Sequence, residues 1–236
     1  MASVLITGFL PESVEVENAS AQLAASVERK APAGWATAFL PQSSQWLRTA
    51  VPQLLTEHQP ALTVLCGQAP GRNHLSLESV ALNLMSFRVA DIDGFAPKEQ
   101  PIIPEAPLAL KTSLGLHAAA ERLRIAHLPA QVSYHAGLFL CNQAYFHALH
   151  HLLYHGAPWQ RVVFLHIPIT PSQVNREKGM SDKPCLTTET VAAGLNLLVA
   201  ALQSSSRDGR PEEAGETEST GDVAGLSSVE RLGLLH

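Results

Sequence analysis

Val4-Leu5-Ile6-Thr7-Gly8-Phe9 is the stretch that decides the class of fold. It is a short, mainly apolar run bounded by turn signals, which is typical of a strand buried on both faces. A helix is expected to follow from about Asn18, with Leu23 and Val27 on its inner face. A buried strand followed by an amphipathic helix is the repeating unit of an α/β fold.

The same alternation continues along the chain. Further strands are expected at 35–40, 61–66, 130–133 and 162–166, and further helices at 43–55, 112–124, 142–154 and 188–202. Residues 75–84 are ambiguous, and residues 88–107, rich in Pro, Asp and Gly, are expected to form an excursion or a hairpin. The pattern predicts a mostly parallel sheet covered on both faces by helices.

Composition divides the chain into two parts. Residues 1–203 have the length and apolar content of one α/β domain, whereas residues 204–220 are mostly Ser, Thr, Glu, Gly and Arg. Such a segment cannot bury enough apolar surface to offset the entropy of ordering, so 204–236 is expected to be a disordered, low-complexity tail. Most of the net charge of −5 lies in this tail, and the nearly neutral remainder argues against a nucleic-acid partner.

The three cysteines show no paired spacing and no CxxC motif. We therefore expect reduced thiols and no structural zinc site. The sequence contains neither a signal-peptide pattern nor an apolar run long enough to cross a bilayer. These features predict a cytoplasmic protein that binds no membrane, metal or other cofactor.

Cys141 lies where a short apolar run meets an amphipathic helical pattern. A thiol at a helix start lies near unpaired N–H groups and the positive end of the helix dipole, and both favour the nucleophilic thiolate. The alternative is a buried structural thiol, because cysteine is among the most buried residue types. By contrast, Cys66 lies within an apolar strand and Cys185 lies in a loop, so neither is expected to react.

Two other residues offer partners for this thiol. His166 ends the predicted strand 162–166, and ligands of parallel α/β sheets bind at the carboxyl ends of their strands. Glu78 lies in an apolar context, where a carboxylate could orient the histidine. A nucleophile, a base and an orienting acid outline a cysteine hydrolase. The simpler alternatives are a surface histidine and a solvated carboxylate.

A second group of titratable residues lies on the helix that follows Cys141. His147 and His151 have the i, i+4 spacing that can bind a metal, and His150 and His155 lie nearby. Helical geometry places the first three histidines opposite the apolar face. We therefore interpret them as a solvated face rather than a metal site.

Three stretches together resemble the pyroglutamyl peptidase I (pyrrolidone-carboxylate peptidase) family of C15-type cysteine peptidases. They occur in the family order as Gly67-Gln68-Ala69-Pro70-Gly71-Arg72 through Leu77-Glu78-Ser79-Val80-Ala81-Leu82-Asn83, then Ser133-Tyr134-His135-Ala136-Gly137-Leu138-Phe139-Leu140-Cys141-Asn142, and finally Val163-Phe164-Leu165-His166-Ile167-Pro168. The likeness extends weakly from Val4 to about Leu202. It implies a three-layer α/β/α sandwich of the phosphorylase/hydrolase-like kind.

The resemblance also implies roles. Cys141 would be the nucleophile, His166 the general base and acid, and Glu78 the residue that orients His166. Arg88 would help the Cys141 backbone N–H to hold the oxyanion. The positions that match the substrate pocket are Phe9, Gln68, Phe139 and Leu140. The implied substrates are peptides with an N-terminal pyroglutamate, and the family implies a possible homodimer or homotetramer.

The first loop departs from the family pattern. Glu12 stands where the family has a second pocket aromatic, and the usual glycine pair is replaced by Ser13 and Val14. This difference leaves two alternatives open, namely a thiol amidohydrolase for another N-acyl or lactam amide and a non-catalytic binding protein of the same fold. A depressed pKa of Cys141 would favour an enzyme over the binding protein.

Overall fold

The computed structural model describes residues 2–13, 16–30 and 32–205. Its centre is a six-stranded sheet in the order β2-β1-β3-β8-β4-β7. The strands are β1 (Val4–Phe9), β2 (Trp35–Leu40), β3 (Leu62–Gln68), β4 (Leu75–Glu78), β7 (Ala130–Ser133) and β8 (Arg161–Ile167). All neighbours are parallel except β4 and β8. The expected mostly parallel sheet is therefore confirmed.

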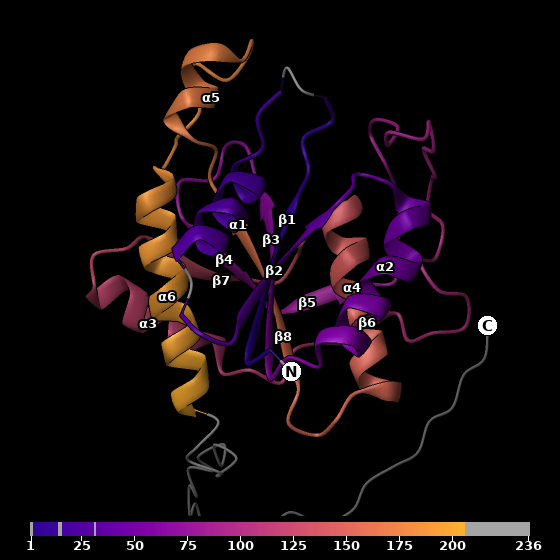
Figure 1. The fold of residues 1–236 in the computed structure, drawn as a ribbon. Coiled ribbons are helices and arrows are strands. Elements are labelled where there is room, and N and C mark those ends of the chain that lie inside the picture. The colour runs from indigo at the N-terminus through magenta and orange to yellow at the C-terminus, as the bar shows by residue number, and fades with distance from the viewer. Residues whose placement is uncertain (1, 14–15, 31, 206–236) are drawn as a thin grey trace, which may run out of the picture.

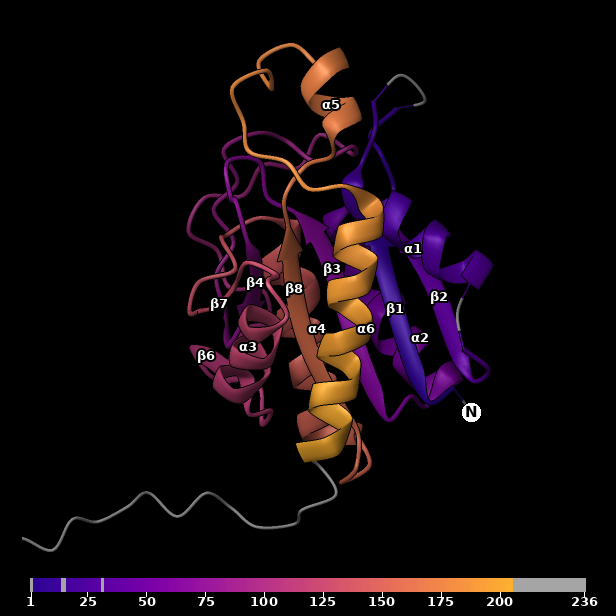
Figure 2. The same ribbon diagram turned by 90° about the vertical axis from the view of Figure 1, so that its left-hand side faces the viewer.

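Helices cover both faces of this sheet (Figures 1 and 2). On one face lie α1 (Ala19–Lys30), α3 (Leu116–Ile125) and α6 (Thr188–Ser205), and on the other lie α2 (Ser44–His58) and α4 (Leu140–His155). The short α5 (Pro171–Arg176) stands beyond the end of the sheet, next to the segment that follows β1. The structure is the predicted three-layer α/β/α sandwich.

The alternation of side chains along β3 decides which residues face which layer. Val64 and Cys66 belong to the apolar cluster formed with α1, α3 and α6. Leu65, between them, belongs to the cluster formed with α2 and α4. Because successive residues of a strand point to opposite faces, Gly67 lies on the α4 side and Gln68 on the α1 side.

The ambiguous segment 75–84 forms β4 and a short β5 (Val80–Leu82). β5 pairs antiparallel with β6 (Ala109–Lys111), so the residues between them are the predicted excursion. The helix expected over 112–124 starts only at Leu116, because the Thr112 hydroxyl donates to the Val162 carbonyl and keeps the preceding chain on the sheet.

Two further boundaries differ from expectation. α5 was not predicted, although Thr170 and Gln173 form a capping box around Pro171 and this pattern was visible in the sequence. α6 continues to Ser205, past the expected end at residue 202. The rest of the predicted tail, 206–236, lies outside the described residues. None of the helices in the described part of the chain is long and apolar enough to span a membrane.

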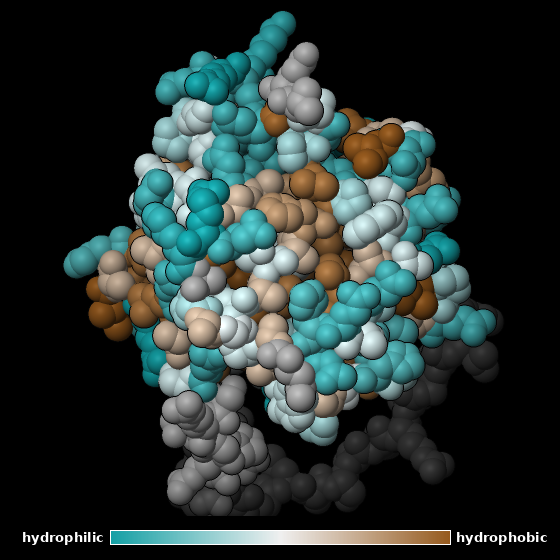
Figure 3. Space-filling model, viewed as in Figure 1, coloured by the Kyte–Doolittle hydropathy of each residue, from teal (hydrophilic) through white to brown (hydrophobic). Residues whose placement is uncertain are grey.

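β2 is one edge of the sheet and pairs only with β1 among the described strands. Its first five residues are half-buried, since the α1 and α2 layers flank the strand without covering it. The apolar surface in the centre of Figure 3 overlies this edge. β1, the next strand inward, is buried along its whole length, whereas β2 is not.

His147 contradicts the interpretation of a solvated histidine face. Its exposure is only 3%, because α4 is covered by the sheet on one side and by α2 and the excursion on the other. A helix enclosed in this way must bury residues all round its circumference. Burial, together with the charges of Arg48 and His150, lowers the pKa of His147 to about 4.

The buried His147 makes stability depend on pH. Between the folded pKa of about 4 and the unfolded value near 6.5, the unfolded chain binds more protons, so stability is full above pH 6.5 and falls as the pH approaches 4. We expect a loss of about 3 kcal/mol from this group in urea unfolding measured at pH 7, 5.5 and 4. His147→Gln should flatten the dependence, whereas the exposed His155→Gln should not; equal slopes in both variants would contradict the assignment.

Candidate active site

A buried carboxylate–imidazole pair lies at the centre of the candidate site. Glu78, the last residue of β4, is 0% exposed, and His166, near the end of β8, is 5% exposed. The Nδ1 atom of His166 lies 2.8 Å from the Oε1 atom of Glu78. With Nδ1–H donating to the carboxylate, Nε2 carries the lone pair and is the ring atom that can accept a proton.

Cys141 is the second residue of α4, and its sulfur lies directly over Gly67 of β3. A Cβ atom added to Gly67 would lie 2.8 Å from Sγ of Cys141 and 2.8 Å from Cζ of Phe164. Gly67 is the register partner of His166 in the parallel β3–β8 pair. Since partners in register point to the same face, the imidazole and the thiol lie on the same side of neighbouring strands. The structure thus brings the three predicted residues to one place.

Arg72 is a part of this site that the sequence analysis missed. Its Nη1 atom lies 2.6 Å from the same Glu78 oxygen that His166 uses, and its Nη2 atom donates to the carbonyl of His135 at 3.4 Å. Arg72 precedes Glu78 by only six residues, but the turn between β3 and β4 is what folds it back onto the carboxylate. The six-residue spacing alone carried no signal of this ion pair.

The first turn of α4 is fixed by hydrogen bonds from its own residues. Asn142 accepts from the N–H of Leu82 at 2.9 Å and donates to the carbonyl of Leu82 at 2.8 Å. The Tyr145 hydroxyl donates to the backbone carbonyl of Glu78 at 2.8 Å. These contacts tie the helix that carries the thiol to the strands that carry the acid, so the relative placement of Cys141 and Glu78 is rigid.

The thiol of Cys141 is not poised as a thiolate. Burial raises its pKa to about 12, and the negative charge of Glu78 raises it too, while Arg72 and the backbone N–H at the helix start lower it. The expectation that the helix start produces a thiolate is therefore wrong, because desolvation outweighs the helix terminus. By the criterion of a depressed thiol pKa, this observation does not favour an enzyme over the binding protein.

The contacts of Glu78 and His166 explain the directions in which their pKa values shift. For Glu78, burial raises the pKa, but hydrogen bonds and charge from His166, with hydrogen bonds from Ser133 and Arg72, lower it overall. For His166, burial lowers the pKa more than the Glu78 carboxylate raises it, and Arg72 lowers it further. At neutral pH the site therefore holds a carboxylate, a neutral imidazole and a neutral thiol.

Three of the predicted pocket residues gather on the face that carries the thiol. Phe9 and Leu140 are buried in the cluster between the sheet and the α2–α4 layer, and Phe139 and Cys141 pack against that cluster. The Phe139 ring contacts the Phe87 ring edge to face, with centroids 4.6 Å apart. These residues therefore belong to one apolar cluster on the sheet face that carries the sulfur.

Arg88 and Glu12 are both exposed. Arg88 follows Phe87, which packs on Phe139 at the start of α4, so its backbone lies close to the candidate site. No hydrogen bond or ion pair joins the Arg88 guanidinium to another described residue. Glu12 extends to the surface, and its charge is therefore not buried against the apolar residues of the cluster.

Gln68 lies at the same edge of the sheet, but its side chain points to the α1 side. Its Oε1 atom accepts from the N–H of Ala19 at 2.9 Å and from Nε2 of Gln173 at 3.0 Å. The side-chain oxygen is thus committed to holding the start of α1 and α5. Any contact of Gln68 with a ligand on the Cys141 side falls to its backbone.

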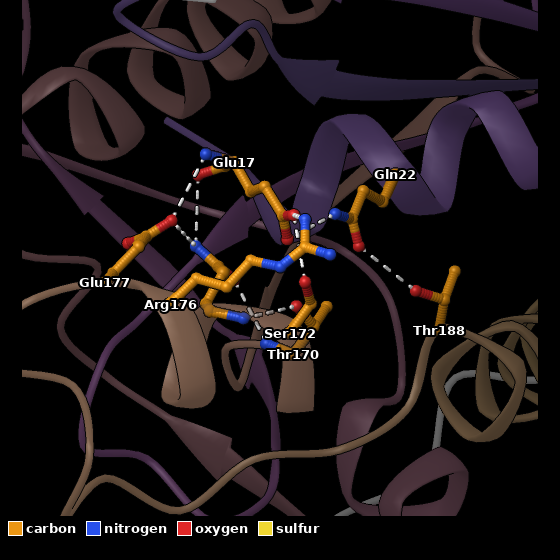
Figure 4. Close-up of polar contacts among 8 residues, drawn as sticks. Glu17, Gln22, Thr170, Ser172, Arg176, Glu177 and Thr188 are labelled. Atoms are coloured by element: carbon orange, nitrogen blue, oxygen red, sulfur yellow. Dashed lines mark hydrogen bonds and ion pairs between the residues drawn. The ribbon is translucent and has the colours of Figure 1, made fainter. Parts of the chain in front are cut away.

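Glu17 extends these hydrogen bonds into a network, which we call the polar clamp, between the segment after β1 and the segment after β8 (Figure 4). Its carboxylate accepts from Ser172, Gln22 and Arg176, its carbonyl accepts from Gln173, and its N–H donates to Glu177. Because β1, β3 and β8 are neighbours, the clamp ties together the segments that leave the carboxyl ends of three adjacent strands. It forms one wall of the edge at which ligands of such sheets bind.

The other two cysteines lie in the kinds of segment that the sequence predicts for them, a buried strand and a loop. Cys66 is fully buried, and burial raises its pKa far above the ordinary value. Cys185 lies in the loop between α5 and α6, where its backbone forms an isolated parallel β-bridge with Ile169. Among the described residues, no group of three or more His, Cys, Asp and Glu side chains is arranged to hold a metal ion.

Gly67→Ala tests whether the absence of a side chain at residue 67 makes room for the sulfur. The added methyl would overlap Cys141 and Phe164, so we expect a destabilisation of about 1–3 kcal/mol and a changed alkylation rate of Cys141. Urea unfolding and iodoacetamide labelling measure the two effects. Gly115→Ala is the matched control, because its added methyl meets open space. Similar behaviour of the two variants would show that Sγ does not lie over residue 67.

Comparison with known proteins agrees with this geometry. The family model described as pyroglutamyl peptidase matches residues 2–205. The pyrrolidone-carboxylate peptidase of Cupriavidus taiwanensis is 37% identical over 218 residues, which cover 92% of this chain and 99% of that protein. The corresponding protein of Deinococcus radiodurans is 37% identical over 171 residues, which cover 71% of this chain and 78% of that protein.

Solved structures show the same similarity. The pyrrolidone carboxyl peptidase from Thermococcus litoralis has a TM-score of 0.80 at 31% identity, covering 89% of this chain and 97% of that one. Pyroglutamyl peptidase I from Bacillus amyloliquefaciens has a TM-score of 0.77 at 28% identity, covering 86% and 98%. The match extends over the whole sandwich and includes every strand that builds the site. This chain therefore belongs to the pyroglutamyl peptidase family of cysteine peptidases.

Proposed function

We propose that this protein removes N-terminal pyroglutamate from peptides, with Cys141 as nucleophile, His166 as general base and acid, and Glu78 as the residue that orients His166. The observation that carries the proposal is the buried Glu78–His166 hydrogen bond on the face of the sheet where the Cys141 sulfur lies. Membership of the family supports the choice of substrate.

The reaction begins from neutral groups. As the sulfur attacks the pyroglutamyl carbonyl carbon, the thiol proton passes to Nε2 of His166, and the negative charge develops on the carbonyl oxygen. Glu78 stabilises the imidazolium that forms. The imidazolium then protonates the leaving amine as the C–N bond breaks, which leaves a thioester on Cys141. Water, deprotonated by His166, attacks the thioester and releases pyroglutamate and the free thiol.

The oxyanion needs donors at the start of α4. The backbone N–H of Cys141 lies in the first turn, where N–H groups have no intrahelical partner, and the N-cap residue Phe139 makes no side-chain hydrogen bond to them. Arg88, whose guanidinium has no hydrogen-bond or ion-pair partner among the residues that the structure describes, is the proposed second donor. A single oxyanion donor typically contributes about 10²–10³-fold to kcat.

The substrate ring is uncharged and has no free amine, so it calls for an apolar surface with a few hydrogen bonds. Phe9, Phe139 and Leu140 are the residues that we propose for this contact, because all three belong to or pack against the apolar cluster on the face that carries the sulfur. The exposed position of Glu12 removes the objection that a charge would face the ring. This favours the pyroglutamyl substrate over another N-acyl amide.

Cys141→Ala tests the nucleophile against a panel of pyroglutamyl, prolyl and glutamyl amides with a reporter amine. We expect the wild type to release the amine from the pyroglutamyl amide, and Cys141→Ala to reduce kcat/KM by about 10⁴-fold or more. Cys185→Ala is the matched control and should retain activity. Preference for another amide would favour the alternative amidohydrolase, and no cleavage of any amide would favour the binding protein.

Arg72→Gln separates the charge of Arg72 from its hydrogen bond to Glu78. Arg72 lowers the pKa of His166, so removing the positive charge should raise that pKa. Since His166 must be neutral to accept the thiol proton, the acid limb of the kcat/KM profile should move to higher pH. Arg176→Gln, which removes an exposed arginine paired with Glu17, should leave the limb in place. An acid limb that moves to lower pH in Arg72→Gln would contradict this electrostatic coupling.

A further inference from the structure

A groove of ≈ 460 Å³ lies between α2, α4 and the 102–104 segment of the excursion. We call it the histidine groove, because four of the residues that line it are His147, His150, His151 and His155. These residues follow Cys141 by 6–14 positions, which at 1.5 Å per residue places them roughly 9–21 Å along α4 from the thiol. The groove is therefore separate from the candidate active site, and the proposed reaction uses none of its residues.

The polar side of the groove carries only basic groups. Arg48 of α2 contributes a guanidinium and α4 contributes the four imidazoles, and no carboxylate is among the described residues that line it. No described residue forms a hydrogen bond or an ion pair with the Arg48 side chain. The positive charge in this groove is therefore not neutralised by the described part of the chain.

The buried imidazole of His147 is a second, independent observation that points to a ligand in this groove. It is 3% exposed, and its Nε2 atom has no hydrogen-bond partner among the described residues. A buried polar atom without a partner is costly, and most such atoms in folded proteins are satisfied by protein, water or a ligand. The residue lines the groove, so a group bound there is well placed to satisfy it after a small adjustment of the ring.

The opposite side of the groove is apolar, built from Pro52 and the segment Ile102-Ile103-Pro104. Arginine and imidazole donors match carboxylate and phosphate oxygens, and the apolar side fits a short hydrocarbon part. We propose that the histidine groove is a second binding site, which takes a small oxyanion, a carboxylate or a phosphate, on Arg48 and the α4 histidines. A metal ion is the less favoured occupant, because the described residues show no cluster of ligands in metal-binding arrangement.

The test is an NMR titration of the imidazole resonances in the full-length protein at pH 7. Inorganic phosphate and benzoate are the probes, and chloride at matched ionic strength is the reference. The Cys141→Ala variant is used throughout, so that turnover plays no part and the outcome is independent of the proposed peptidase activity. We expect saturable shifts of His150 and His151, and tighter binding of benzoate than of phosphate if the apolar side contributes.

Matched variants assign the shifts to this groove. Arg48→Gln should weaken binding about tenfold, because a charge-assisted hydrogen bond is lost. Arg29→Gln removes the same charge from the exposed end of α1 and should have no effect. His150→Asn gives a second test on a half-buried residue, and it avoids the risk that a His147 variant fails to fold.

Three results would overturn the proposal. They are shifts that do not saturate with either probe, equal weakening by Arg48→Gln and Arg29→Gln, and saturable binding of Zn²⁺ that neither oxyanion displaces. Saturation by phosphate or benzoate that depends on Arg48 would support it, and the stronger of the two probes identifies the oxyanion class.

Discussion

The ion pair and hydrogen bond that converge on one oxygen of Glu78 are the constraint on which the site depends. A fully buried carboxylate is tolerated only when charges and donors compensate for its lost hydration. His166 and Arg72 supply that compensation at 2.8 and 2.6 Å. The arrangement exists because β4 runs antiparallel beside β8 and places the carboxylate of one strand beside the imidazole of the next. The only antiparallel pairing among the described strands of the main sheet therefore has a direct functional consequence.

Close packing of α4 against Gly67 is the second feature on which the geometry of the candidate site depends. The start of α4 can approach the sheet only because β3 has no side chain at this position. The same approach removes water from the sulfur and raises the pKa of Cys141. The packing that places the sulfur on the same face as His166 thus works against a resting thiolate. The proposed reaction therefore resembles that of a serine–histidine pair, in which the base takes the proton during attack.

The start of α4 and its later turns differ in the residues that they carry. Its first two turns are fixed by Asn142 and Tyr145 and include the thiol, whereas its later turns carry histidines that face α2 and the excursion. This second region owes its character to burial, since His147, expected on the surface, is a buried neutral group whose Nε2 has no partner in the described part of the chain. A second site on the same helix would be mechanically linked to the first through a rigid element.

The sequence by itself determined most of the strands and helices, the three-layer class and the identity of Cys141, His166 and Glu78 as candidates, because these rest on local patterns and on stretches that resemble the family. It left β4, β5, β6 and α5 unassigned. Only the tertiary structure decided the partnership of Arg72 with Glu78, the direction in which Gln68 points and the burial of His147. It also decided that the thiol is protonated. Each of these depends on which surfaces meet across the sheet, and desolvation and ion pairing act through that three-dimensional contact rather than through neighbours along the chain.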